Sequence, residues 1–141
     1  MIVIDIKNML RDQRVLSVLA YSQYMPTADT LHRLADQCAA DPAVSAFACE
    51  DQGAILGAII LKAAGGGAFE ILHIATAPPH RGKGIASELI SHAIEALQCA
   101  VLVAETDDDA VDFYRKYGFQ IESLGEKYPG TIRYRCTLRL R

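Results

Sequence analysis

The sequence contains no tryptophan, few prolines and no excess of basic over acidic residues. Its formal net charge of −3 gives no general attraction to nucleic acid or to an anionic membrane surface. No apolar run reaches the roughly 18 residues that a membrane-spanning helix needs. The start, MIVIDIKNML, has no basic segment followed by a longer apolar core, so it does not resemble a signal peptide. We therefore expect a cytoplasmic protein with neither nucleic acid nor membrane as a partner.

Cysteine and histidine are present, but not at the spacing of a metal site. The cysteines form no C-x-x-C pair, which argues against zinc and against a redox dithiol. We expect buried reduced thiols, because cysteine then behaves as a small apolar side chain. The residues concerned are Cys38, Cys49, Cys99 and Cys136, with His32, His73, His80 and His92. No metal is predicted.

The length of 141 residues, about half of them apolar, predicts one domain over residues 1–141 with a substantial core. Apolar runs and periodicity predict the order β-α-α-β-β-β-α-β-α-β-β, an α/β fold. The expected strands are 2–6, 44–50, 54–62, 69–75, 101–105, 120–124 and 131–140. The expected helices are 8–21, one from Thr27 or Asp29 to about 41, 84–97, and one that begins within 106–109 and ends near 117.

Alternating arginines mark the last of these strands. Ile132, Tyr134 and Cys136 alternate with Arg133 and Arg135, and the pattern continues to the end of the chain. A nucleic-acid stripe is one interpretation. We favour a solvated face that also discourages pairing at the edge of the sheet.

The most informative stretch is 69–97, which reads as a strand, a break, a basic glycine turn and a helix. Pro78 and Pro79 lack amide protons and must end the strand's hydrogen bonding. Arg81-Gly82-Lys83-Gly84 follows, and apolar residues then recur at helical spacing. A helix that begins near Gly84 would point unpaired amides, with the helix dipole behind them, at the space beyond the strand. Such a turn is suited to a phosphate or diphosphate.

Three phosphate-binding patterns compete for this turn. A P-loop fails, because Gly84 is followed by Ile85-Ala86 rather than Lys-Ser/Thr. A dinucleotide fingerprint fails at its third glycine, where Ser87 stands, although Glu105 lies about where a ribose-binding acid belongs. The third pattern, R/Q-x-x-G-x-G/A after a strand, is matched by residues 81–86.

The segments ILHIATAPPHRGKGIASELI and AVDFYRKYGF resemble the two signatures of the GNAT superfamily of N-acetyltransferases, in the right order and at the right distance. The resemblance covers about residues 44–124. It implies a mixed, mostly antiparallel sheet flanked by helices, with a central strand that splays from its neighbour and leaves a V-shaped opening for acyl-coenzyme A. The family also suggests a homodimer.

The resemblance further implies where acetyl-CoA would bind. The pantetheine arm would lie along the main chain of one strand, and the diphosphate would sit on the amides of the turn. The corresponding residues are Ile74, Ala75 and Thr76 for the arm, and Arg81, Gly82, Lys83, Gly84, Ile85 and Ala86 for the diphosphate. Asp107 stands where many relatives have an asparagine that contacts the arm, and its other interpretation is a helix N-cap.

Catalytic roles follow from the same resemblance. Tyr114 matches the tyrosine that serves as general acid to the departing thiolate, although it could be a core aromatic residue. Glu70 matches a general-base glutamate of the histone-acetylating branch, although it could be a solvated or cross-strand paired acid. His73 competes as base by its type and its place on the same strand, and Glu105 could hold a water that relays the proton.

The sequence therefore predicts an N-acetyltransferase that moves an acetyl group from acetyl-CoA to an amine by direct attack in a ternary complex. The alternative is a regulatory domain of the same fold that binds acyl-CoA without turnover. The acceptor, a small-molecule or peptide amine, is not identified, although acids such as Glu50, Asp51 and Glu122 would favour a cationic one.

Overall fold

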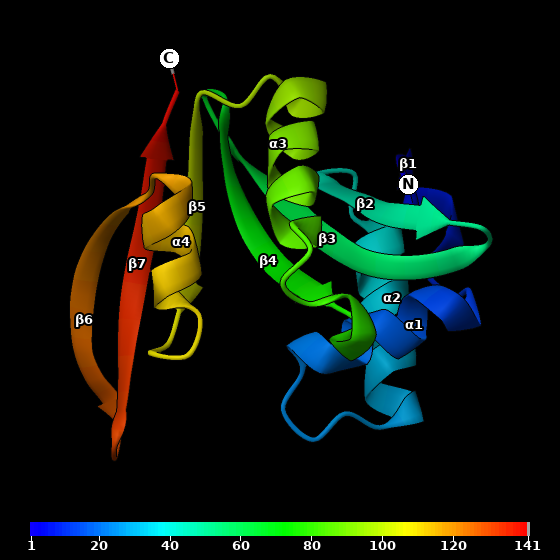
Figure 1. Ribbon diagram of the computed structural model, residues 1–141, viewed down its shortest axis with the longest axis horizontal. Helices are drawn as coiled ribbons and strands as arrows, with labels where there is room; N and C mark the ends of the chain where they lie inside the picture. Colours follow the sequence, from blue (N-terminus) through cyan, green and yellow to red (C-terminus); the bar gives the residue numbers. More distant parts are fainter. Residues whose placement is uncertain (141) are drawn as a thin grey trace.

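The computed structural model describes residues 1–140, which form one seven-stranded sheet with helices on both faces (Figure 1). The strands are β1 (Ile2–Asp5), β2 (Val44–Asp51), β3 (Ala54–Gly65), β4 (Ala68–Thr76), β5 (Val101–Thr106), β6 (Gln120–Tyr128) and β7 (Thr131–Arg139). The helices are α1 (Gln13–Leu19), α2 (Ala28–Ala40), α3 (Ile85–Leu97) and α4 (Val111–Tyr117), with short 3-10 turns η1 (Lys7–Met9), η2 (Ala20–Ser22) and η3 (Pro78–His80). The predicted α/β class and element order are confirmed.

The strands lie in the order β1-β2-β3-β4-β5-β7-β6, and only β4 and β5 run parallel. Their pairing is confined to Ala68–Glu70 opposite Val101–Val103, whereas β4 stays paired with β3 as far as Thr76. A bulge at Leu72 shifts the β3–β4 register directly after this point, and a bulge bends its strand. Figure 1 shows β4 and β5 together at one end and apart at the other. The predicted splayed central strand is thus confirmed.

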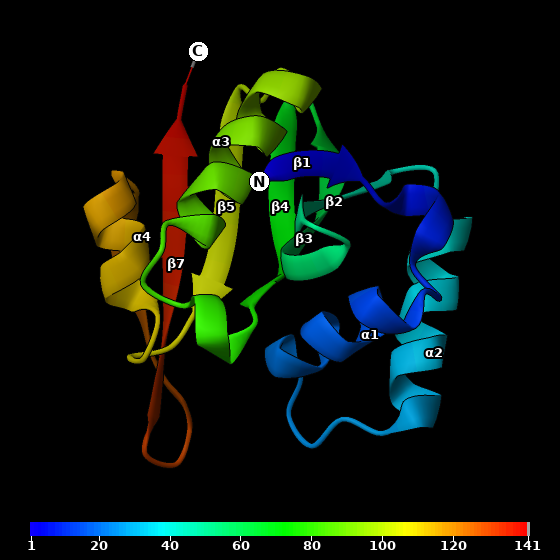
Figure 2. The same ribbon diagram turned by 45° about the vertical axis from the view of Figure 1, so that its right-hand side comes forward.

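Two apolar clusters, one on each face of the sheet, hold the fold together. The first joins α1 and α2 to β2, β3 and β4, and the second joins α3 and α4 to the same strands and to β5 and β7 (Figure 2). β3 belongs to both, since Ile59 and Ile60 point to opposite faces and are fully buried. All four cysteines are buried, as predicted. Within residues 1–140, no helix is long and apolar enough to cross a membrane.

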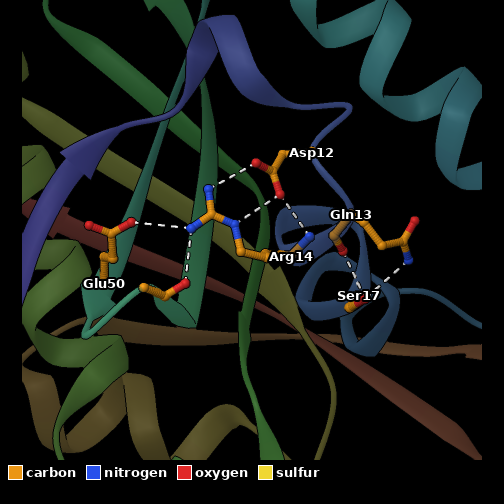
Figure 3. A network of polar contacts seen from close by, with 6 residues as sticks. Asp12, Gln13, Arg14, Ser17 and Glu50 are labelled. Atoms are coloured by element: carbon orange, nitrogen blue, oxygen red, sulfur yellow. Dashed lines mark hydrogen bonds and ion pairs between the residues drawn. The ribbon is translucent and has the colours of Figure 1, made fainter.

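The first predicted helix, 8–21, is broken. η1 comes first, and α1 begins only at Gln13, after Asp12 accepts a hydrogen bond from the Arg14 amide at 2.8 Å. Aspartate competes with the helix backbone in this way, which is why it starts helices. Figure 3 shows the Arg14 guanidinium, held by Asp12, reaching Glu50 at the end of β2. These contacts fix α1 against the β2–β3 turn.

The start of α4 also differs from the prediction. β5 continues through Thr106, because Thr106 pairs with Tyr134 of β7, and the helix begins at Val111 without a side-chain cap. The second helix, in contrast, starts as predicted at Thr27, whose side chain accepts from the Thr30 amide. Gly118 ends α4, as predicted, with its amide donating to Tyr114 and Arg115 carbonyls.

β7 does not lie at an edge of the sheet. It pairs with β5 on one side and with β6 on the other, so its arginines do not protect an edge, and that expectation is wrong. β6, which extends to Tyr128 rather than ending at 124, takes the edge position.

β3 approaches the start of α3 at Gly57. A Cβ atom built there would lie 2.6 Å from Cγ2 of Ile85 and 3.0 Å from the carbonyl oxygen of Ala75. Gly57 pairs with Thr76, the last residue of β4. The lack of a side chain at this position therefore sets the distance between the end of β4 and the first turn of α3.

We predict that Gly57→Ala lowers the free energy of unfolding by about 1–3 kcal/mol, the usual cost of overpacking a core. The measurement is chemical denaturation, with Gly57→Ala made in the wild-type and in the Ile85→Ala background. The loss of unfolding free energy should be smaller in the Ile85→Ala background, where the Cγ2 atom is absent. A variant more stable than wild type, as expected if only strand entropy mattered, would contradict this.

Candidate active site

The turn between β4 and α3 is built from backbone conformations that favour glycine. η3 ends at His80, and Gly82 and Gly84 then adopt φ values of +76° and +80°. Gly84 occupies the position before the first helical residue, Ile85, and no side chain caps the helix. A Cβ atom at Gly82 or Gly84 would meet nothing within 4 Å. The glycines thus leave open the space in front of the helix.

Most amides of this turn have no acceptor among residues 1–140. The N–H of Arg81 donates to the Pro78 carbonyl at 3.3 Å, and the first bond of α3 runs from Glu88 to Gly84 at 3.0 Å. Between these two, no hydrogen bond from the amides of residues 82–87 to any residue within 1–140 is found. Apart from that of Arg81, the predicted amides are therefore available to an anion, with the dipole of α3 behind them.

A cavity of about 300 Å³ lies in front of these amides. Its lining residues are Thr76, His80, Arg81, Gly82, Gly84, Ile85, Ala86, Ser87 and Phe113, and we call it the turn cavity. The Arg81 side chain donates to the Thr76 carbonyl at 3.3 Å and lies 5.6 Å from the centre of the Tyr21 ring. Arg81 thus joins the turn to the end of β4 and to η2. Lys83 is exposed and Ala75 is buried, and neither lines the cavity.

A second cavity, of about 260 Å³, lies where β4 and β5 part, and we call it the wedge cavity. Its lining residues are Ser22, Ile71, Leu72, His73, Ile74, Glu105, Thr106, Ala110, Tyr114 and Arg133. The two cavities adjoin, since Ile74 and Thr76 of β4, and Tyr114 and Phe113 of α4, line one each. An extended ligand could therefore occupy both.

Tyr114 is a core residue and a cavity residue at once. Its ring is 4% exposed and makes edge contacts with Phe113 at 5.2 Å and Phe119 at 5.1 Å between ring centres. No hydrogen bond to its hydroxyl is found from residues 1–140. Burial raises the pKa of Tyr114 above its ordinary value, because a phenolate would be poorly solvated there. The phenol thus keeps its proton well into the alkaline range.

His73 and Glu105, the two competing bases, line the wedge cavity together with Tyr114. The side-chain nitrogen Nε2 of Gln23 lies 3.0 Å from Nδ1 of His73. Because this NH2 group can only donate, the contact corresponds to the His73 tautomer with its proton on Nε2. Burial lowers the pKa of His73 below its ordinary value, and the ring is neutral at pH 7. The Glu105 carboxylate lies 3.5 Å from Nζ of Lys127 and 4.0 Å from the Arg135 guanidinium.

Glu70 and Asp107 do not join this group. Glu70 is exposed where β4 and β5 are still paired, opposite Lys62 of β3, and it lines neither cavity. Asp107 lines neither cavity, and its Oδ1 accepts from the Asp109 amide at 3.0 Å. Their roles stay predictions.

Several residues that line the cavities, or that contact a lining residue as Gln23 contacts His73, were not expected from the sequence. Phe113 could have been found, because it precedes Tyr114 in the second signature. Arg133 was visible only as one member of an alternating run, and Ser22 and Gln23 gave no signal. They reach the site from distant parts of the chain, η2 and its following residue and β7.

Comparisons with known proteins agree with this architecture. A model of the acetyltransferase (GNAT) family matches residues 6–119. A comparison with curated protein sequences finds no match. Among solved structures, an aminoglycoside 6'-N-acetyltransferase complexed with coenzyme A superposes with a TM-score of 0.83 at 14% identity, covering 99% of this chain and 97% of that one.

Two other structures show the same fold. A mutant spermidine N-acetyltransferase from Vibrio cholerae has a TM-score of 0.74 at 22% identity and covers 99% of this chain and 95% of its own. A ribosomal-protein-S18-alanine N-acetyltransferase from Escherichia coli has a TM-score of 0.76 at 16% identity and covers 98% of this chain and 92% of its own. The named acceptors of the three structures differ.

We predict that Gly84→Glu weakens the binding of coenzyme A at least about tenfold relative to Gly84→Gln, because only the former places a negative charge at the amides. Both variants share the strain of a positive φ, so the difference isolates the charge. Calorimetric titration with coenzyme A measures it. Equal affinities of the two variants would place the phosphates elsewhere.

Proposed function

The chain belongs to the acetyltransferase (GNAT) family, and from this premise we propose that it transfers an acetyl group from acetyl-CoA to an amine by direct attack within a ternary complex. The observation that carries the proposal is the pair of adjoining cavities, one in front of unpaired amides and the other beside Tyr114. This is the arrangement that two substrates held side by side require.

The residues present fit acetyl-CoA, which would supply the thioester. Amides of residues 82–87 would bind its diphosphate, with Arg81 and Lys83 as flanking cations. The pantetheine arm would follow β4 along Ile74, Ala75 and Thr76, where the strand is no longer paired with β5. Main-chain groups at such an edge bind an extended ligand much as they bind another strand.

The acceptor amine would enter the wedge cavity. The chemistry forms a nitrogen–carbon bond and breaks a carbon–sulfur bond, so the amine loses a proton and the sulfur gains one. Holding both partners in adjoining cavities supplies much of the rate, since the attack becomes effectively unimolecular. No covalent enzyme intermediate is required.

Tyr114 would assist the departing sulfur. Its hydroxyl has no partner within residues 1–140, so it can donate a hydrogen bond without first breaking one. An ordinary phenol is already a weaker acid than a thiol, and burial raises the pKa of Tyr114 further. Tyr114 therefore stabilises the developing thiolate mainly by hydrogen bonding, and the proton balance is completed by the proton that the amine releases.

The geometry favours a different base from the one that the resemblance implies. Glu70, the base that the resemblance implies, lies outside the wedge cavity. Nδ1 of His73 already accepts from Gln23, and Nε2 carries the proton, so neutral His73 is a donor here. Glu105 remains as the carboxylate that can receive the proton from the amine, directly or through a water.

A turnover screen tests the proposed function. Wild-type protein should release free thiol from acetyl-CoA in the presence of at least one member of a diverse amine panel. Tyr114→Phe should lower kcat at least about tenfold with the affinity for coenzyme A and Tm nearly unchanged, because the hydroxyl makes no protein hydrogen bond. Binding of acetyl-CoA without turnover of any amine would favour the alternative, a regulatory acyl-CoA-binding domain.

Matched substitutions show whether Glu105 or Glu70 is the base. Glu105→Gln should lower kcat at least about tenfold, whereas Glu70→Gln should leave kcat within about twofold of wild type. Steady-state kinetics with the acceptor found in the screen are the measurement. The opposite pattern would assign the base to Glu70, as the resemblance implies.

A further inference from the structure

Arg133 is partly buried and has no polar partner among residues 1–140. Within residues 1–140, no hydrogen bond, ion pair or ring contact of its side chain is found. Every other arginine in this range is exposed. Several of those exposed arginines are nevertheless held by carboxylates: Arg11 by Asp36, Arg14 by Asp12, Arg115 by Asp112 and Arg135 by Glu122.

The fold makes Arg133 part of the lining of the wedge cavity. Arg133 lies on β7 opposite Gly125 of β6, one register step beyond the end of β5 at Thr106. There it lines the same cavity as Tyr114, Glu105 and His73. Arg133 therefore lines the region proposed for the acceptor and is partly buried there.

The nearest acid in the cavity does not neutralise Arg133. Glu105 has two other cations within 4.0 Å, Lys127 and Arg135. The Glu105 carboxylate thus already has two cationic neighbours, and the charge of Arg133 is not neutralised by it. His73 adds a second donor to the cavity through Nε2–H, because Gln23 holds its Nδ1.

Acids that would favour a purely cationic acceptor lie elsewhere and are already paired. Glu50 contacts Arg14 at 3.5 Å, Asp51 contacts the N-terminal amino group at 3.6 Å, and Glu122 contacts Arg135 at 3.8 Å. None of the three lines the wedge cavity. The cavity thus offers a polyamine no surplus of negative charge.

A partly desolvated charge without a counter-charge costs folding free energy. A ligand that supplies an anion recovers this cost, and a guanidinium binds a carboxylate with two parallel hydrogen bonds. The volume of about 260 Å³ lies below the usual range for drug-sized ligands, which favours a small molecule.

We propose that Arg133 binds the carboxylate of the acceptor, and that the acceptor is a small amine of the amino acid class, with its amino group toward Tyr114 and Glu105. This rests on the proposed function, whose acceptor class it specifies. Arg133 is thus the residue that distinguishes an amino acid from an amine without an anion.

The test compares acceptors that differ only in the carboxylate. The common L-amino acids and their carboxamides, with spermidine as a cationic amine, are assayed at one pH by thiol release from acetyl-CoA. At least one amino acid should be used with kcat/KM at least about tenfold above its carboxamide. Intrinsic reactivity alone would favour the carboxamide, because amidation lowers the pKa of the amino group and a larger fraction of it is then the unprotonated nucleophile.

Variants then assign the preference to one residue. Arg133→Gln should raise KM for the amino acid at least about tenfold, with a smaller change in kcat and none in KM for acetyl-CoA, and should leave the carboxamide unaffected. Arg133→Lys should restore part of the affinity. Arg139→Gln, on the same strand but outside the wedge cavity, is the matched control and should behave as wild type. Tm of Arg133→Gln should equal or exceed that of wild type, because no protein contact is lost.

The outcomes separate this inference from the proposed function. Carboxamides or spermidine used as well as amino acids, or an unchanged preference in Arg133→Gln, would overturn the role of Arg133 while the transferase activity stands. If no amine is turned over, the proposed function fails, and calorimetry of amino acids with coenzyme A-saturated protein decides the inference. Binding that Arg133→Gln abolishes would support it, and absent or unchanged binding would overturn it.

Discussion

The pairing of β4 with β5 over only three residues is the constraint on which the site depends. Up to Glu70 the two strands share hydrogen bonds, and beyond it a bulge at Leu72 bends β4 away while β3 continues to hold its other edge. The main-chain groups that face the gap then lack a strand partner, and such groups need water or a ligand. The same divergence opens the wedge cavity and leads β4 to the turn in front of α3.

Each side of the wedge contributes a different kind of group. The side of β4 supplies main-chain donors and acceptors, the glycine turn and the amides of α3, which fit a long ligand with an anionic part. The side of β5, β7 and α4 contributes Glu105, Arg133 and Tyr114, whose ionisable or hydrogen-bonding side chains line the cavity. Ser22 of η2 also lines the wedge cavity, and Gln23, the next residue, contacts the His73 ring that lines it.

Local sequence was sufficient for the features that depend on neighbouring residues. The strand–turn–helix unit around Gly84 was predicted because glycines, prolines and helical periodicity act over a few residues. The start of α4 was predicted too early, because pairing of Thr106 with Tyr134 lengthens β5, and such long-range pairing leaves no local signal. Arg133 was read as a solvated side chain for the same reason. Whether β7 lies at an edge depends on strand order, which alternation along the strand does not encode.

Arg81 lines the turn cavity and contacts a residue next to the wedge cavity. Its guanidinium lies over the ring of Tyr21 and its Nε donates to the Thr76 carbonyl, and Tyr21 immediately precedes Ser22 of the wedge cavity. An anion in the turn would compete with the Tyr21 ring for this guanidinium, and the segment that carries Ser22 and Gln23 would then lose that contact. Occupancy of one cavity is then linked to affinity in the other, and thermodynamics requires this linkage to be the same in both directions. One side chain would thereby couple the affinities of two ligands that do not touch its own charge at the same point.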